Sequence, residues 1–262
     1  MRTFTIGSND YIRAEIEGQK RRLISKEAFD RFNPALLGLG RLTSTASSTD
    51  TIAAAFDLEG FTTFCKQIEP HLSVPVFLSE FLEWLMDQIK AEMMHEKYTE
   101  GISLWGPLPF FVKFMGDGLL VLWDVSKADD NARRNIVVAC REICLRYARE
   151  FHPMMEAKVS DPPSVLRCGM ARGTVFSVGD GHDFVGSCIN MAVRVQKLPG
   201  ATFAFNRRGI NIDDPFAVNF FRDELVVKRV TVRGIGDKEL VCIPKFEFDA
   251  MPPPDQAFYR DV

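Results

Sequence analysis

Apolar residues recur at helical spacing in three segments of the chain. Between residues 73 and 97 every fourth position is apolar, at Phe77, Phe81, Leu85, Ile89 and Met93. This spacing predicts a long helix with one face packed against a core. Residues 129–151 predict a second helix, with Asp at its start and Arg further along, as the helix dipole favours. Residues 189–198 predict a third, which Pro199 and Gly200 would end.

Shorter apolar runs between these segments predict strands. Residues 51–58 (TIAAAFDL) predict a buried strand that closes on an acid, and residues 110–123 predict a hairpin with Gly-Asp-Gly at its tip. Further short strands are predicted at residues 164–171, 174–179, 202–206, 225–232 and 240–244. Because hairpins and helices are mixed along the chain, we expect an α+β fold with a mostly antiparallel sheet flanked by helices.

The beginning and the end of the chain differ from this central pattern. Residues 9–32 are charged and compatible with a helix, for which Ser8 or Asn9 is a candidate N-cap, and residues 42–50 resemble a Ser/Thr-rich linker. The proline-rich end is expected to be disordered or docked on a partner. We therefore predict an N-terminal helical appendage, a main domain and a C-terminal tail, over residues 1–50, 51–247 and 248–262.

Composition narrows the classes of protein to consider. The chain has 262 residues, a net charge of −3 and a pI near 5.9, which leaves no electrostatic footprint for nucleic acid or an anionic membrane. We find neither an apolar run of about 18 residues nor the apolar segment of a secretory signal. The six cysteines show no zinc-binding spacing and are expected to be free, buried thiols. These features predict a cytoplasmic protein with no nucleic-acid and no membrane partner.

Two acids occupy positions of possible chemical importance. Asp57 closes the strand of residues 51–58, and Asp117 lies at the predicted hairpin tip. If the two strands are neighbours, both carboxylates lie at one end of the sheet, where they repel each other unless a cation neutralises them. A hard divalent ion such as Mg²⁺ would fit, and such a pair suits phosphoryl or nucleotidyl transfer. A solvated turn acid beside a capping acid is the structural alternative.

An amide and a guanidinium stand together on the third predicted helix. Asn190 and Arg194 are four residues apart and therefore share one helix face. Side by side, these groups can bind a phosphate or stabilise the charge of a phosphoryl transition state. An ordinary solvated surface pair is the alternative interpretation.

Five segments, taken together, resemble the class III nucleotidyl cyclases and occur in the order found in that family. They are FDLEGFT (56–62), KFMGD (113–117), LRCGMARG (166–173), DFVGSCINMAVR (183–194) and VRGIGD (232–237). The resemblance extends over about residues 51–245. It implies the fold of a class III cyclase catalytic domain, with a palm or ferredoxin-like core, and the conversion of a nucleoside triphosphate to a 3′,5′-cyclic nucleotide and pyrophosphate.

The resemblance assigns the catalytic and metal-binding roles. It implies that Asp57 and Asp117 hold two divalent cations, Mg²⁺ or Mn²⁺, and that the backbone carbonyl of Leu58 completes one metal shell. It also implies that Asn190 orients the ribose and that Arg194 stabilises charge around the α-phosphate.

The substrate-binding residues follow in the same way. Arg167 would bind the triphosphate. Arg233 stands where the family usually has a Lys for the terminal phosphates, which keeps the charge but changes the geometry. Lys113 and Asp183 occupy the base-reading positions.

Active sites of this family lie between two subunits. The resemblance implies that Asp57 and Asp117 come from one chain, and that the second chain supplies Lys113, Asp183, Asn190, Arg194 and Arg233. Because this chain carries both sets, a head-to-tail homodimer with two equal sites is implied.

The identity of the base rests on two opposing signals. A Lys/Asp pair at positions 113 and 183 is the family's adenine pattern and favours ATP. The segment from Asp57 to Leu85, with its Phe/Trp-rich helix, looks similar to bacterial pyrimidine cyclases of the Pycsar phage-defence type, which signal to a separate effector protein. The separation of 60 residues between Asp57 and Asp117 also exceeds the family's common spacing. We expect UTP before CTP, with ATP as the alternative.

Two other classes of function stay open at this point. A cyclase-like domain without catalysis would be a nucleotide-binding module, for which the replacement of Lys by Arg233 is the supporting feature. A palm-type polymerase or dinucleotide cyclase would also place metal-binding acids near a hairpin, although the helix with Asn190 and Arg194 argues against it.

Overall fold

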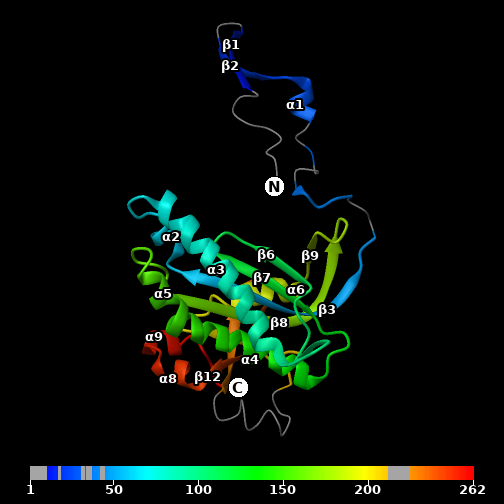
Figure 1. Cartoon of the computed structure of the whole chain (residues 1–262), viewed down its shortest axis with the longest axis vertical. Helices are drawn as coiled ribbons and strands as arrows, with labels where there is room; N and C mark the ends of the chain where they lie inside the picture. Colours follow the sequence, from blue (N-terminus) through cyan, green and yellow to red (C-terminus); the bar gives the residue numbers. More distant parts are fainter. Residues whose placement is uncertain (1–10, 17–18, 31–32, 34–36, 42–44, 212–224) are drawn as a thin grey trace. The chain divides into compact units, whose positions relative to one another are not determined.

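The computed structural model describes residues 11–16, 19–30, 33, 37–41, 45–211 and 225–262 (Figure 1). The chain divides into two units. The first contains residues Met1–Ser48 together with Phe176–Val185, and the second contains Thr49–Val175 together with Gly186–Val262.

A mixed sheet forms the centre of the second unit. Its strand order is β11-β12-β10-β8-β3-β7-β6. β9 pairs with the end of β8 at Phe176–Val178, and both of these segments belong to the first unit. The β3–β7, β6–β7, β10–β12 and β11–β12 pairs are antiparallel, and β8–β10 is parallel. The mostly antiparallel α+β architecture expected from the sequence is therefore confirmed. The strands are β3 (Ser48–Glu59), β6 (Phe111–Phe114), β7 (Gly118–Asp124), β8 (Val165–Val178), β9 (Asp183–Val185), β10 (Phe203–Asn206), β11 (Leu225–Val232) and β12 (Gly236–Pro244).

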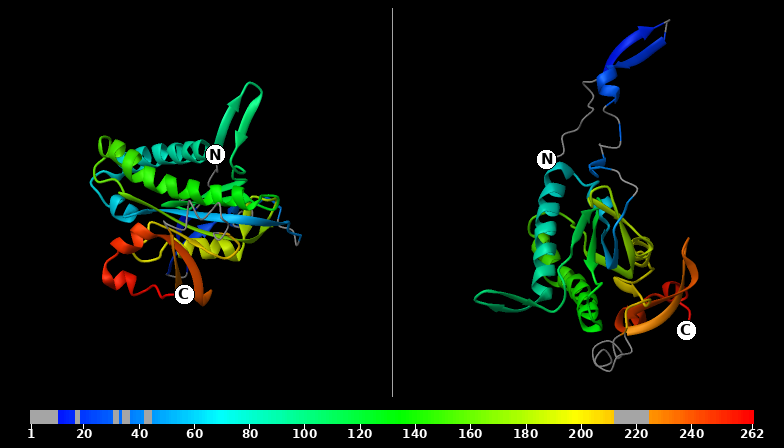
Figure 2. Two further views of the ribbon diagram at one scale, coloured as in Figure 1. Left: turned by 90° about the horizontal axis from the view of Figure 1, so that it is seen from below. Right: turned by 90° about the vertical axis from the view of Figure 1, so that its right-hand side faces the viewer.

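Helices cover both faces of this sheet. Figure 2 shows α3 and α4 on one face and α6 on the other. The helices are α2 (Phe61–Phe64), α3 (Pro70–Met93), α4 (Asp130–Arg146), α5 (His152–Glu156), α6 (Ser187–Val195), α8 (Lys245–Ala250) and α9 (Pro253–Gln256), with a π-helical turn at Tyr147–Phe151. The Asp129 side chain caps α4 by accepting a 2.8 Å hydrogen bond from the Ala132 N–H, which fixes the predicted start of this helix.

The apolar stripe predicted for the long helix forms the centre of the core. Phe77, Phe81, Leu85, Ile89 and Met93 are all at most 2% exposed. Aromatic rings continue the cluster beyond α3: the Phe77 and Phe151 rings lie 5.8 Å apart edge to face, and Phe81 packs against Tyr147 at 6.0 Å. This ring packing anchors α3 to α4 and holds both over the sheet.

The N-terminal segment was predicted to be helical, and that prediction is wrong. Residues Tyr11–Ile16 (β1) and Gln19–Ile24 (β2) form an antiparallel hairpin, and only Lys26–Asp30 (α1) is helical. The sequence alternates apolar and polar residues over positions 12–16 (IRAEI), which is strand periodicity, and the charges obscured it. The candidate N-caps Ser8 and Asn9 and linker positions 42–44 lie outside the described residues.

The long helix also ends earlier than its predicted range of residues 73–97. It ends at Met93, and a second hairpin follows, formed by β4 (Met94–Tyr98) and β5 (Gly101–Leu104). Its tip is formed by Thr99 and Glu100, and Gly101 directly after it disfavours a continued helix. This hairpin accounts for part of the long separation between Asp57 and Asp117.

The C-terminal tail is docked on its own chain and is not disordered. The Tyr259 side chain is 6% exposed, and its hydroxyl donates a 2.6 Å hydrogen bond to the Pro199 carbonyl. The backbones of Arg229 and Arg260 form a bridge, and Lys228 pairs with Asp261 at 2.7 Å. Residues 248–262 therefore extend the core of the second unit.

The cysteines are free thiols, as expected, and all but the partly exposed Cys65 are buried. Burial raises the pKa of the Cys188 thiol to about 11, which makes it unreactive at neutral pH. In the part of the chain that the structure describes, no helix is both long and apolar enough to cross a membrane.

Candidate active site

The two acids singled out in the sequence meet at one end of the sheet. β3 and β7 are antiparallel neighbours, and Asp57 lies opposite Gly118 in their register. The Leu58 N–H donates a 3.0 Å hydrogen bond to the Asp117 carbonyl. The backbone of the hairpin tip is thus bonded to β3 directly beside Asp57, which confirms that the strands are neighbours.

The geometry of this tip favours glycine on both sides of Asp117. Gly116 has φ 98°, a conformation that residues with a side chain rarely adopt, and the Met115 N–H donates a 2.8 Å hydrogen bond to the Gly118 carbonyl across the tip. A Cβ atom on Gly118 would come 1.9 Å from the Phe56 carbonyl oxygen. The first glycine therefore permits the turn, and the second permits the close approach of β7 to β3.

Burial and repulsion act together on Asp57. Burial raises the pKa of its carboxyl, and the Asp117 carboxylate raises it further, while Lys197, the Gln196 hydrogen bond and Arg167 act in the opposite direction. The groups that lower the pKa are therefore outweighed by burial together with the neighbouring carboxylate. A cation bound between them would relieve this imbalance. Among the described residues, no group of three or more His, Cys, Asp or Glu side chains could hold a metal, so the acid set here is a pair.

Arg167 lies beside this pair on β8 but is engaged by another acid. Its Nε donates to Glu59 Oε2 at 3.0 Å and its Nη2 to Glu59 Oε1 at 2.6 Å. This bidentate pair fixes the guanidinium plane next to the end of β3. A phosphate that bound Arg167 would have to replace Glu59 or share the guanidinium with it.

The amide and guanidinium of α6 point away from the sheet. Cys188, Met191, Ala192 and Val195 form the buried face of this helix, whereas Asn190 and Arg194 are exposed. Within the described residues, neither exposed side chain has a hydrogen-bond or ion-pair partner, and neither contacts Asp57 or Asp117. One chain thus presents the acid pair and the Asn/Arg pair as two separate sets.

A second arginine lies near Arg194. Residues Val232–Ile235 form a turn closed by a 3.0 Å bond from the Ile235 N–H to the Val232 carbonyl, with Gly234 at φ 75°. A Cβ atom on Gly234 would lie 3.6 Å from Arg194 Nη2. The turn that carries the exposed Arg233 therefore lies against the Arg194 guanidinium, and the two cations come from different elements.

The two predicted base-reading residues lie in different units. Lys113 is exposed on β6, opposite Leu120 in the β6–β7 register. Asp183 is on β9, in the first unit, and its Oδ1 accepts a 2.9 Å bond from the Phe184 N–H. Their joint role stays a prediction.

Sequence reasoning missed three polar residues around Asp57: Gln196, Lys197 and Glu59. Gln196 is only 3% exposed, and its Nε2 donates to Asp57 Oδ2 at 3.0 Å. The sequence offered only a weak signal, a polar residue directly after the helix of Asn190 and Arg194. Only the packing of α6 could show which partner it had.

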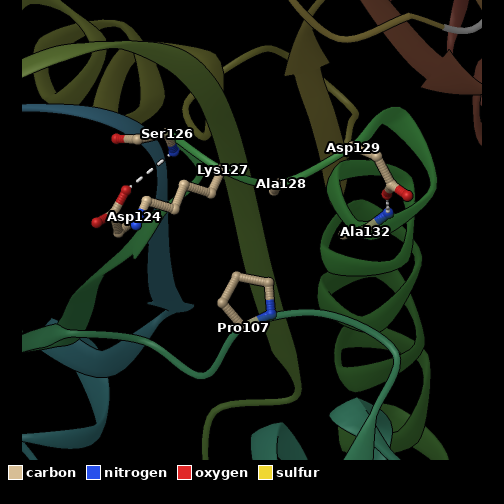
Figure 3. Close-up of a pocket in the computed structure, with 7 residues that line it drawn as sticks. All are labelled: Pro107, Asp124, Ser126, Lys127, Ala128, Asp129 and Ala132. Carbon is tan, nitrogen blue, oxygen red and sulfur yellow. Dashed lines mark hydrogen bonds between the residues drawn. The ribbon is translucent and has the colours of Figure 1, made fainter.

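A hollow lies at the other end of β7, the end of Asp124. It has a volume of 590 Å³ and is lined by Pro107, Asp124, Ser126, Lys127, Ala128, Asp129 and Ala132 (Figure 3). Its acids already have structural partners. Hydrogen bonding by the Ser126 side chain, and then by the Ser126 N–H at 2.9 Å, lowers the pKa of Asp124, and Asp129 caps α4. This hollow is separate from the acid pair and contains none of the predicted site residues.

Comparison with known proteins gives matches in structure only. No protein-family model matches the sequence, and the search of curated proteins found no similar sequence. The adenylyl cyclase CyaB from P. aeruginosa matches with a TM-score of 0.55 and 14% identity, over 76% of this chain and 95% of that chain. The guanylyl cyclase Cya2 matches with a TM-score of 0.55 and 18% identity, over 80% of this chain and 96% of that chain.

A third similar structure is the guanylate cyclase domain of RhGC from Catenaria anguillulae in complex with GTP. Its TM-score is 0.50 at 18% identity, over 76% of this chain and 98% of that chain. The chain has the class III cyclase fold. The five segments that resembled the class III cyclases thus lie in a chain that has that fold.

The close approach at Gly118 gives a first prediction. We expect Gly118→Ala to lower the free energy of unfolding by about 2–3 kcal/mol, because a Cβ cannot fit 1.9 Å from the Phe56 oxygen without moving the strands. Urea unfolding measures the change. Gly101→Ala is the control, since a Cβ there meets nothing within 4 Å; equal effects of the two changes would contradict the account.

The raised pKa of the Asp57 carboxyl gives a second prediction, which concerns stability against pH. Its ionised form costs stability above the raised pKa, and the cost disappears as the pH falls below the ordinary pKa of Asp. We therefore expect Asp57→Asn to raise the unfolding temperature of metal-free protein at neutral pH, by an amount on the order of a few degrees. The gain should shrink in acid, and thermal scans from pH 7 to pH 4 in EDTA would reveal it. A gain that is the same at both pH values would point to a cause other than charge.

Proposed function

We propose that this chain is a nucleotidyl cyclase, which converts a nucleoside triphosphate to a 3′,5′-cyclic nucleotide and pyrophosphate. The observation that carries the proposal is the pair of carboxylates, Asp57 and Asp117, at one end of the sheet in a class III cyclase fold. The pair explains why the tip sequence is Gly-Asp-Gly, which turn geometry alone would not require to contain an acid.

The donor set fits two divalent cations, Mg²⁺ or Mn²⁺. Two carboxylates lie close enough for Asp117 to raise the pKa of Asp57, and the Leu58 carbonyl would add a third oxygen donor. When bound, the ions would lower the pKa of the ribose 3′-hydroxyl and offset charge on the phosphates.

The protein's own task is then to orient a single substrate. The 3′-oxygen attacks the α-phosphorus in line and pyrophosphate leaves, so nucleophile and electrophile belong to one molecule and the protein mainly fixes their geometry. Asn190 orients the ribose, and Arg194 stabilises the charge around the α-phosphate. Arg167 and Arg233 bind the triphosphate, and Arg167 exchanges part of its Glu59 pairing for phosphate oxygens.

A head-to-tail homodimer would complete the site. In one chain Asn190 and Arg194 are exposed and do not contact the acid pair within the described residues. This supports a site in which one subunit supplies Asp57 and Asp117 while the second supplies the exposed face of α6. A two-fold arrangement of this kind gives two equal sites.

For the base, we propose a pyrimidine, UTP before CTP, with cyclic UMP as an anti-phage signal to a separate effector protein in the cytoplasm. The support is the resemblance of the segment from Asp57 to Leu85 to Pycsar-type cyclases. Adenylate cyclase activity is the second candidate, favoured by the Lys113/Asp183 pair, since Lys can donate to a ring nitrogen and Asp can accept from an exocyclic amine. An inactive nucleotide-binding module is the third.

The function and the base are tested together. We expect protein incubated with equimolar ATP, GTP, CTP and UTP plus Mn²⁺ to yield one cyclic nucleotide, cyclic UMP, resolved by mass. Asp117→Asn should reduce turnover at least about 1,000-fold, because the site loses one of its two carboxylates, while circular dichroism and dimer mass stay unchanged. If the product is cyclic AMP, the substrate is ATP and the assignment of UTP is wrong. Tight nucleotide binding without any product would indicate the binding module.

The shared site is tested by mixing inactive variants. Asp117→Asn and Arg194→Ala each damage every site of their own homodimer, but a mixed dimer would contain one intact site. Random exchange of subunits should restore about a quarter of the wild-type activity. The control is a mixture of Asp117→Asn with Asp57→Asn, whose lesions lie on the same side of the site and should not complement. Equal activity in the two mixtures would argue against a site shared between subunits.

A further inference from the structure

We propose that Gln196 is a positioning residue that orients the Asp57 carboxylate for a divalent cation. This inference rests on the proposed cyclase function. It concerns a residue outside the motifs that carry the family resemblance, at the end of the helix on which Asn190 and Arg194 lie.

The contact is direct and sheltered. The Gln196 side chain is 3% exposed, and its Nε2 donates to Asp57 Oδ2 at 3.0 Å. A hydrogen bond to a half-buried carboxylate holds it in one orientation more firmly than a bond to a neutral group would. With Oδ2 engaged by the amide, Oδ1 stays available to a ligand, and Oδ2 keeps a second acceptor position.

The packing of α6 places Gln196 there. A Cβ atom on Gly169 of β8 would come 2.1 Å from the backbone nitrogen of Gln196 and 2.3 Å from the carbonyl oxygen of Ala192. The helix end therefore lies directly on the backbone of β8, and β8 is the neighbour of β3 in the sheet. This close approach lets a side chain from α6 reach Asp57.

The chemistry of a neutral amide suits this position. Glutamine donates a hydrogen bond without adding a charge, so the two carboxylates keep their full attraction for a cation. An acid at position 196 would add a third negative group, and an apolar residue would leave Asp57 Oδ2 without this donor. Residues that hold metal ligands in place in this way commonly change metal affinity 10–100-fold when they are replaced.

The same bond joins the two functional sets of one chain. Gln196 follows Arg194 by two residues, so the backbone that carries Asn190 and Arg194 is tied to the acid pair of its own chain. In the proposed dimer these sets serve different sites. A change in the orientation of Asp57 would therefore act directly on the end of α6 through this hydrogen bond.

The test compares Gln196→Met with Gln256→Met. Methionine keeps the length of glutamine but cannot donate. Gln256 is a matched control, since its Nε2 donates to the Phe248 and Met251 carbonyls, both at 3.1 Å, away from the acids. Electron paramagnetic resonance of free Mn²⁺ gives the metal affinity of full-length protein, with the 3′-deoxy analogues of UTP and ATP present so that no turnover occurs.

We expect Gln196→Met to weaken Mn²⁺ binding about tenfold or more, and Gln256→Met to leave it unchanged. In assays, the Mn²⁺ concentration for half-maximal activity should rise by a similar factor for Gln196→Met, with most of kcat recovered at saturating metal. A purely structural role would instead lower unfolding temperature and kcat together, without the shift in metal dependence. Gln196→Leu, of similar size, serves if the methionine variant does not fold.

The variants Asp57→Asn and Asp117→Asn distinguish a failure of the Gln196 proposal from a failure of the metal site. If they weaken Mn²⁺ binding and the Gln196 variants do not, the positioning role is wrong and the cyclase proposal stands. If neither Asp variant alters Mn²⁺ binding, the metal site itself is wrong, and the role of Gln196 falls with it.

Discussion

Backbone pairing between β3 and β7 brings two negative charges to the same end of the sheet, and the rest of the site is arranged around them. Asp57 lies opposite Gly118, and the Leu58 N–H is bonded to the Asp117 carbonyl. Neither strand can move away without breaking this ladder. Burial and the Asp117 carboxylate together raise the pKa of Asp57, while Lys197, Gln196 and Arg167 act in the opposite direction.

A site that holds two carboxylates side by side needs a rigid support. The aromatic cluster of α3 and the turns that follow α4 covers one face of the sheet, and α6 covers the other (Figure 2). Glycines at positions 118 and 169 let β7 and α6 approach their neighbours more closely than any side chain would permit. The core therefore fixes the acid pair from both sides, while Asn190 and Arg194 are left on the surface for a second chain.

Prediction from sequence succeeded where periodicity and chemistry agreed. The stripe of α3, the Asp129 cap of α4 and the glycine turn at Asp117 each follow from local spacing. It failed where charge masked the pattern. The alternation of residues 12–16 was hidden by Arg and Glu, and the hairpin after Met93 continued a segment of strong helix formers. The tail at Tyr259 was misjudged because proline content says nothing about docking on a distant carbonyl.

The sequence by itself determined the candidate acids, the Asn/Arg pair and the class of fold, because each depends on residue type and short spacing. Tertiary structure alone decided that Asp57 and Asp117 meet, that Arg167 is paired with Glu59, and that Gln196 reaches Asp57. These contacts join residues more than 50 positions apart, and their geometry depends on strand order and on how closely α6 packs against β8. No local pattern encodes such distances, since they result from the packing of the whole sheet.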